Sequence, residues 1–153
     1  MKLGKILEFI ERYFDYLFKE YGFSVISETD FDSFGNWVIV LQSDSSRIRF
    51  FQDRGEVSLA VGPLWSPPSW QAGPWYDLSV ITTFLSKGQH TFKYELGTTE
   101  RQLERLTQAL HLSCKQICEL FQETTYQRIR QELDEYSEQA LEQDWNKLLG
   151  KEN

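Results

Sequence analysis

One histidine and two cysteines in the C-terminal half of the chain have the residue types that bind transition metals. His111, Cys114 and Cys118 fall within about 60° of arc on a helix that turns about 100° per residue. Imidazole and thiolate groups are ligands for zinc and copper. A fourth ligand has no sequence signature, and cysteine is often buried as a small apolar side chain. These residues are therefore metal candidates for which packing in a core is the favoured interpretation.

A second candidate set combines arginine with aromatic side chains. It comes from one predicted strand and from the loop that follows the sheet, and its members are Arg47, Arg49, Phe51, Trp65, Trp70 and Trp75. Guanidinium groups beside aromatic rings can hold a carboxylate or a phosphate through paired hydrogen bonds and stacking. These six residues form the candidate site for a ligand or a partner.

The loop with the three tryptophans, LWSPPSWQAGPW, allows two arrangements. It can fold down as a lid on small side chains of the sheet, such as Val38, Val40 and Ala60, while the arginine stems lie along the surface. It can also stand out from the sheet and present its tryptophans to a protein partner. The small side chains of the covered face favour the lid.

Catalytic chemistry has little support in the sequence. A nucleophilic site needs a base beside the nucleophile, and the chain has only two histidines, His90 and His111. The chain has no P-loop and no dinucleotide-binding glycine motif. A carboxylate pair that forms only in the fold is the alternative. We therefore predict a non-catalytic protein without a cofactor.

Four short β-rich runs predict an antiparallel sheet, and they cover 23–29, 37–43, 47–53 and 57–63. We expect a two-residue turn at Arg54 and Gly55, and Gln42 opposite Arg47 across the SDSS turn. With this register, the apolar residues of three strands fall on one face of the sheet. Apolar spacing predicts a helix from Leu3 to Tyr21 that covers this face.

The C-terminal half is predicted to be helical. Asp77 can cap a short helix over 78–85, and Thr99 with Gln102 resembles a capping box at the start of a longer region that reaches Leu149. The apolar stripe of that region shifts by about 120° near 122–126. Either the helix kinks or breaks there, or one long helix offers a second face. The fold prediction is a single α+β domain over 1–153, in which 123–149 either folds back or projects as an interaction segment.

Charge is distributed unevenly along the chain. The 153 residues carry 16 Lys and Arg against 23 Asp and Glu, which gives a net charge of −7. From Glu119 to Asn153 there are nine acids and four bases, so −5 of the total lies there. An acidic protein is a poor nucleic-acid binder, because phosphates need clustered Lys and Arg. We predict a basic protein partner, or a homodimer through the C-terminal helix.

No membrane segment is expected. The uncharged stretch from Val57 to Tyr76 is interrupted by prolines at 63, 67, 68 and 74, and charged residues interrupt the N-terminal apolar run. The two cysteines stand four residues apart on a predicted helix, too far apart to form a disulfide with each other. These features predict a reducing, cytoplasmic location.

The stretch RIRFFQDRGEVSLAVGP, followed by WYDL, resembles a run in small uncharacterised bacterial α+β proteins. Its marks are an Arg-x-Arg strand, a DRG turn, a strand that ends in Gly-Pro, and WYDL before a short helix. The small acidic α+β shape is also similar to bacterial immunity proteins, which neutralise a toxin by binding it. The resemblance implies a bacterial protein of immunity or regulatory type that acts by protein contact. The competing hypothesis is an anion binder or enzyme that uses the Arg/Trp face.

Overall fold

Five antiparallel strands form one sheet in the computed structural model, which describes residues 2–32 and 34–150. The strands are neighbours in chain order, namely β1 (Ser24–Asp30), β2 (Trp37–Gln42), β3 (Ser46–Asp53), β4 (Glu56–Pro63) and β5 (Tyr76–Asp77). The predicted meander of four strands is present. The two-residue strand β5 was not predicted, and it pairs only with Ala60 and Val61 of β4.

The register of the central strands follows from their turns. Gln42 lies opposite Arg47, and Asp53 lies opposite Glu56, both as predicted. Arg54 and Gly55 have φ angles of 51° and 86°. Two positive φ angles are typical of the tight turn whose twist matches that of the flanking strands. This turn places the apolar residues of β2, β3 and β4 on one face.

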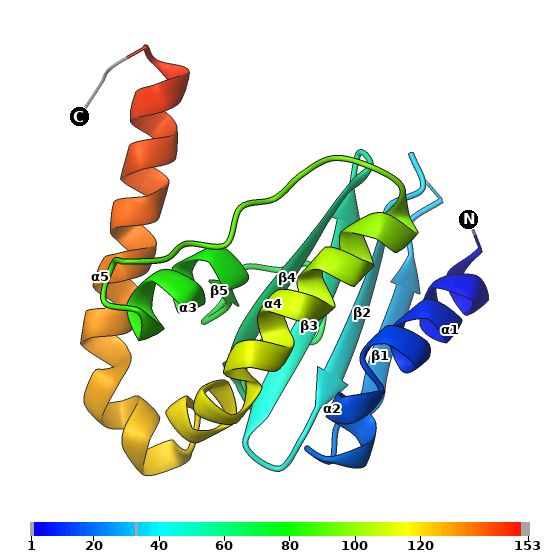
Figure 1. Ribbon diagram of the computed structural model, residues 1–153, viewed down its shortest axis with the longest axis horizontal. Helices are drawn as coiled ribbons and strands as arrows, with labels where there is room; N and C mark the ends of the chain where they lie inside the picture. Colours follow the sequence, from blue (N-terminus) through cyan, green and yellow to red (C-terminus); the bar gives the residue numbers. More distant parts are fainter. Residues whose placement is uncertain (1, 33, 151–153) are drawn as a thin grey trace.

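That apolar face is covered by α1 (Leu3–Tyr13), α2 (Asp15–Lys19) and α4 (Thr99–Leu120) (Figure 1). The single helix predicted over 3–21 is interrupted at Phe14, whose φ and ψ are −113° and 30°. Phe14 is fully buried, and its ring meets Phe50 edge-on at 4.9 Å between centroids. We attribute the break to this packing, because the turn at Phe14 lets both Phe14 and Leu17 reach the core.

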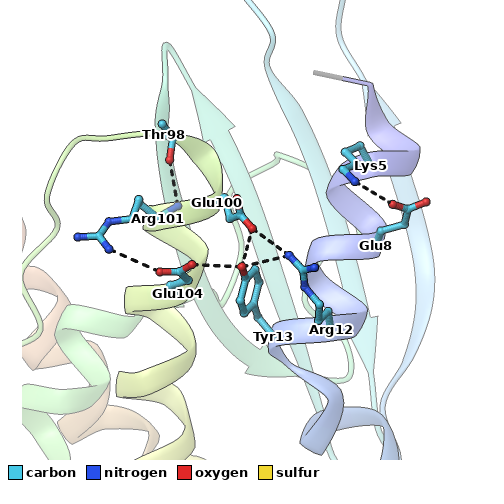
Figure 2. Close-up of polar contacts among 8 residues, drawn as sticks. All are labelled: Lys5, Glu8, Arg12, Tyr13, Thr98, Glu100, Arg101 and Glu104. Carbon is cyan, nitrogen blue, oxygen red and sulfur yellow. Dashed lines mark hydrogen bonds and ion pairs between the residues drawn. The ribbon is translucent and has the colours of Figure 1, made fainter.

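A polar cluster joins α1 to α4 at the surface (Figure 2). Arg12 donates to Glu100 at 2.9 Å, and the Tyr13 hydroxyl lies 2.5 Å from the same Glu100 oxygen and 3.1 Å from an oxygen of Glu104. The hydrogen bond to Glu100 raises the pKa of Tyr13, so its hydroxyl keeps its proton and acts as a donor. The two helices are thus held side by side by charged and hydroxyl groups above their apolar contact.

The remaining helices lie beside β4 and β5, and they are α3 (Leu78–Leu85) and α5 (Glu123–Leu148) (Figure 1). The predicted cap of α3 is confirmed, because the Asp77 carboxylate accepts the backbone N–H of Ser79 at 2.9 Å. The cap of α4 is Thr98, which accepts from the N–H of Arg101 at 3.2 Å, so the prediction of Thr99 was wrong by one residue. Of the two alternatives for 122–126, the structure has the break, since α4 ends at Leu120 and α5 begins at Glu123.

The first half of α5 returns to the core. Tyr126 and Leu133 are fully buried, and Ile129, Tyr136 and Ala140 pack against the core with part of their surface exposed. The last turns of α5 extend past α3 toward the C-terminus (Figure 1). The fold-back alternative therefore applies to the first half of α5.

Candidate functional site

The Pro- and Trp-rich loop, residues 64–75, lies over the second face of the sheet as a lid. Arg47 donates to the carbonyl of Ser66 at 2.6 Å, and Arg49 donates to the carbonyls of Ser69 and Gln71 at 3.0 and 3.1 Å. Beneath the lid Val38 and Val40 are fully buried, and Ala60 is nearly so. The side chains of one strand thus hold the loop down through its backbone.

Gly62 on β4 is required by the close approach of the lid. A Cβ atom at this position would lie within 3 Å of Ser66 Oγ and of the carbonyl oxygen of Pro74. Ser66 Oγ donates to that same carbonyl at 2.9 Å, which joins the two ends of the lid. A side chain at position 62 would therefore lift the lid from the sheet.

The two arginines are engaged by the lid rather than open to an anion. Arg47 donates through Nε to Gln42 at 2.8 Å, and the guanidinium of Arg49 stacks 4.8 Å from the ring centroid of Trp75. Burial lowers the pKa of Arg49, and the charge of Asp77 partly offsets this effect. One terminal nitrogen of each guanidinium, Nη1, is thus used to hold loop carbonyls, and Nε of Arg49 is buried beneath the lid.

The three tryptophans go to different places. Trp75 lies below Arg49 and donates its indole N–H to the carbonyl of Pro67 at 3.1 Å. Trp65 is 53% exposed, and its ring packs at 5.5 Å from that of Tyr126. Trp70 is 60% exposed, and it lines a hollow with Phe51. The structure therefore brings together two members of the predicted set, Phe51 and Trp70, in one open site.

The metal candidates on α4 do not converge, because Cys114 and Cys118 contact each other while His111 stacks elsewhere. The ring of His111 stacks on Tyr16 at 4.0 Å with an interplanar angle of 8°. Cys114 is buried in the core, and Cys118 is partly exposed. Across residues 2–32 and 34–150, no three His, Cys, Asp or Glu side chains gather in a group that could hold a metal ion. We assign these three residues to packing.

A groove of about 760 Å³ lies between the second half of α5 and the body of the protein. Its walls come from β4, the start of α3, the segment before α4, and α5, and they include Asp77, Phe92, Lys93, Tyr94, Leu141 and Asp144. Sequence reasoning missed this groove because its lining residues come from separate segments and share no motif.

Asp77 is the most deeply placed charged group of the groove. Its two carboxylate oxygens accept from the Tyr94 hydroxyl at 2.8 Å and from the Ser79 N–H and hydroxyl at 2.9 and 2.7 Å. Burial raises the pKa of Asp77, while the hydrogen bonds from Ser79 and Tyr94 and the charge of Arg49 act in the opposite direction. One oxygen is occupied by the cap of α3 and the other by Tyr94, so the arrangement holds the start of α3 against the segment before α4.

The apolar stripe of α5 changes direction after Ala140. On the core-facing side, the next positions are polar: Gln143, Asp144 and Lys147. The apolar residues move about 120° around the helix to Leu141, Trp145 and Leu148, which are 71%, 60% and 76% exposed. We call these three residues the α5 stripe. It borders the groove through Leu141 and has the i, i+4, i+7 spacing of a docking face.

The helix beside this stripe is strongly acidic. From residue 131 to residue 144 the chain has six Asp and Glu and neither Lys nor Arg. Five of these carboxylates are exposed, all except that of Asp134, and they create a negative potential along this part of α5.

A scan against protein-family models, a search of curated proteins and a search of solved structures give no match to this chain. Within the described part of the chain, none of the helices has the apolar length to cross a bilayer.

Proposed function

We propose that this protein is a non-catalytic binding protein of immunity or regulatory type, which holds a basic segment of a protein partner against α5. The proposal rests on one observation, the exposed α5 stripe beside a groove, on a helix that carries five exposed carboxylates between residues 131 and 144. The stripe lies on a helix whose core-facing residues are already in place, so these side chains are not needed for folding.

The apolar part of the contact would come from Leu141, Trp145 and Leu148. A single exposed leucine is ordinary on a protein surface, but three large apolar residues on one helical face mark an interaction site. Tryptophan is among the residues that contribute most to protein interfaces. Full burial of a leucine side chain in an interface contributes about 1.5–3 kcal/mol to the binding free energy. Trp145 is thus the expected anchor, with the two leucines beside it.

The charge of α5 favours a basic partner over a second copy of this chain. The five exposed carboxylates between residues 131 and 144 would attract Lys and Arg side chains of a partner. The same carboxylates on a second copy of this chain would repel those of the first. Attraction of this kind raises the association rate and weakens with added salt. We therefore expect binding that is tighter at low ionic strength.

The experiment uses a synthetic amphipathic peptide with leucine at i, i+3, i+4 and i+7 and lysine elsewhere. Titration of the full chain is followed by calorimetry, and the same peptide with glutamate in place of lysine is the charge control. We expect binding of the lysine peptide that weakens at least about tenfold when the Leu141→Ser, Trp145→Ser and Leu148→Ser changes are combined. Binding of the glutamate peptide should be undetectable.

The matched control is Leu112→Ser on α4. Leu112 is 88% exposed and lies away from the groove, so its replacement should leave peptide binding unchanged. Equal loss with Leu112→Ser, or equal binding of both peptides, would refute the proposal. Sedimentation of the chain alone provides a second check. A dimer that disappears in the α5 variant would assign the stripe to self-association and overturn the basic partner.

A further inference from the structure

A second site lies on the face of the sheet that the lid covers, where three aromatic residues line an open hollow. The hollow has a volume of about 310 Å³, and its lining residues are Phe31, Asn36, Phe51 and Trp70. They come from the end of β1, the start of β2, the outer face of β3 and the lid. At about 30 Å³ for each water molecule, the hollow has room for a small organic group.

The backbone on both sides of Trp70 is fixed by hydrogen bonds from Arg49. Arg49 donates to the carbonyl of Ser69 and to that of Gln71, the two residues on either side of Trp70. Arg49 stands two residues before Phe51 on β3, so both side chains leave the same face of the strand. The backbone N–H of Gln71 also bonds to Ser69 Oγ at 3.2 Å. Arg49 is therefore a positioning residue that fixes Trp70 relative to Phe51.

The opposite wall is fixed by Asn36. Its side chain accepts the backbone N–H of Arg54 at 2.8 Å and donates to an oxygen of Asp53 at 3.3 Å. The backbone carbonyl of Asn36 accepts the N–H of Phe31 at 3.1 Å. These bonds join two turns of the sheet, and they bring the Asp53 carboxylate to the rim of the hollow.

The rim is negatively charged. Asp30 and Asp32 flank Phe31 in the chain, and Asp53 follows Phe51 on the same face of β3. All three are exposed, and in the part of the chain that the structure describes none has a Lys or Arg nitrogen within 4 Å. The positive charge of Arg54 is the exception at this end of the sheet, and the charge of Arg49 is partly offset by Asp77.

We propose that the hollow of Phe31, Phe51 and Trp70 binds an organic cation of the alkylammonium class. The faces of aromatic rings attract cations through their quadrupole, and alkylated ammonium groups combine this attraction with apolar contact. The carboxylates at the rim, which form no ion pair within the described residues, add to the attraction. This site is independent of α5. It also reverses the charge preference expected from Arg47 and Arg49 in the sequence, because both arginines are engaged by the lid.

The probe is choline, and its uncharged isostere 3,3-dimethylbutan-1-ol is the control. Both are titrated into the ¹⁵N-labelled full chain, and the indole N–H signals and the backbone amide signals of Phe31, Asn36 and Phe51 are followed by NMR, so that variants without Trp70 can be read as well. We expect choline to shift the Trp70 signal with a Kd in the millimolar range, and the isostere to bind at least about tenfold more weakly. A peptide with one trimethyllysine is the second arm. Binding tighter than that of choline would identify a protein side chain as the source of the cation, and weaker binding would identify a free small molecule.

The variants separate the rings from the lid as a whole. Trp70→Ala and Phe51→Ala should abolish the choline response, whereas Trp65→Ala, a similarly exposed tryptophan of the same lid, should keep it. Asp53→Asn tests the rim without removing a ring, and it should weaken choline binding severalfold and reduce its dependence on salt. Arg49→Leu should weaken choline binding although Arg49 does not touch the ligand, because leucine cannot donate to the carbonyls of Ser69 and Gln71.

Three results would overturn the proposal. The first is equal affinity for choline and its isostere, which would make the hollow an ordinary apolar surface. The second is a choline response that survives in Trp70→Ala, provided that the spectrum of this variant remains dispersed as in the native protein. The third is the absence of any choline-induced shift in the native chain.

Discussion

The side-chain oxygen of Gln102 accepts the backbone N–H of Val57 at 2.8 Å and thereby closes an edge of the sheet that β5 is too short to cover. The amide nitrogen of Gln102 donates to the carbonyls of Gly55 and Gly97 at 2.7 and 3.0 Å. Further along the same edge, the Tyr94 hydroxyl accepts the N–H of Leu59 at 3.2 Å. Side chains from two other segments thus replace the missing part of a strand.

Replacement of Gln102 by leucine should destabilise the protein by about 1–3 kcal/mol, because the buried N–H of Val57 would lose its acceptor. Urea unfolding followed by circular dichroism measures this change. Gln108→Leu on the exposed side of the same helix is the control and should change the free energy of unfolding by less than about 0.5 kcal/mol. Equal effects of the two variants would contradict the assigned role of Gln102.

Replacement of Tyr76 by phenylalanine should loosen α5 from the sheet. The Tyr76 hydroxyl lies 2.5 Å from an oxygen of Asp134 and 2.7 Å from the hydroxyl of Tyr126, and burial raises the pKa of Tyr76, so it remains a donor. Its loss leaves the buried Tyr126 hydroxyl unpaired, at a cost of about 1–3 kcal/mol.

Hydrogen exchange of the α5 amides is the measurement for Tyr76→Phe. We expect faster exchange in α5 and unchanged exchange in α1, which lies across the sheet. Asp134→Asn keeps an oxygen acceptor and should have the smaller effect. Uniform acceleration over the whole chain would show that Tyr76 stabilises the fold in general rather than the docking of α5.

The stability contribution of Asp77 should fall as the pH rises. Burial raises its pKa above the ordinary value of 3.8, so the folded state keeps a proton that the unfolded state has released. Between the unfolded and the folded pKa the free energy of unfolding therefore decreases with pH, and above the folded pKa the loss is constant. Asp77→Asn lacks this ionisation and still accepts from Ser79.

The measurement for Asp77 is urea unfolding of the native protein and Asp77→Asn at several values from about pH 3 to about pH 7. The asparagine variant should gain stability relative to the native protein as the pH rises. The opposite trend would mean that the hydrogen bonds of Asp77 outweigh its burial.

Cys118 should be the reactive thiol of the folded protein. A hydrogen bond from Cys114 lowers the pKa of Cys118, although burial opposes this effect, and the pKa of Cys114 is raised by the same bond and by burial. Iodoacetamide should modify one cysteine per folded chain, and Cys118→Ala should abolish the reaction.

The pH dependence of the modification rate tests whether the hydrogen bond from Cys114 lowers the pKa of Cys118. In Cys114→Ala the bond to Cys118 is missing, so modification of Cys118 should slow severalfold at neutral pH and recover at higher pH. Unchanged rates in this variant would show that Cys114 does not stabilise the Cys118 thiolate.

The central sheet was predictable because its register depends on local turn chemistry. Arg54 and Gly55 form a two-residue turn, and this turn sets the register of β3 and β4. The alternation of apolar residues in the two strands then determines which face is buried. The break at Phe14 could not be predicted in the same way. It results from the contact of Phe14 with Phe50, which lies 36 positions further along the chain.

The lid and the hollow show why the candidate site was only partly predictable. Its aromatic and arginine residues were visible in the sequence, but the partners of Arg49 are backbone carbonyls, which any residue can offer. The sequence therefore could not show whether Arg49 faces a ligand or the backbone of the loop. The α5 stripe does have a sequence signal, the spacing of Leu141, Trp145 and Leu148. This signal is hard to separate from the core-facing stripe, which ends only one residue earlier at Ala140.

The separation of the two stripes on α5 also bears on how such a protein can change over time. The turns after Ala140 contribute little to the core, so substitutions there should cost little folding free energy. New specificities could accumulate at this end of the helix while the sheet and its lid remain the same. The fold thus keeps the requirements of stability and the choice of partner in separate parts of one helix.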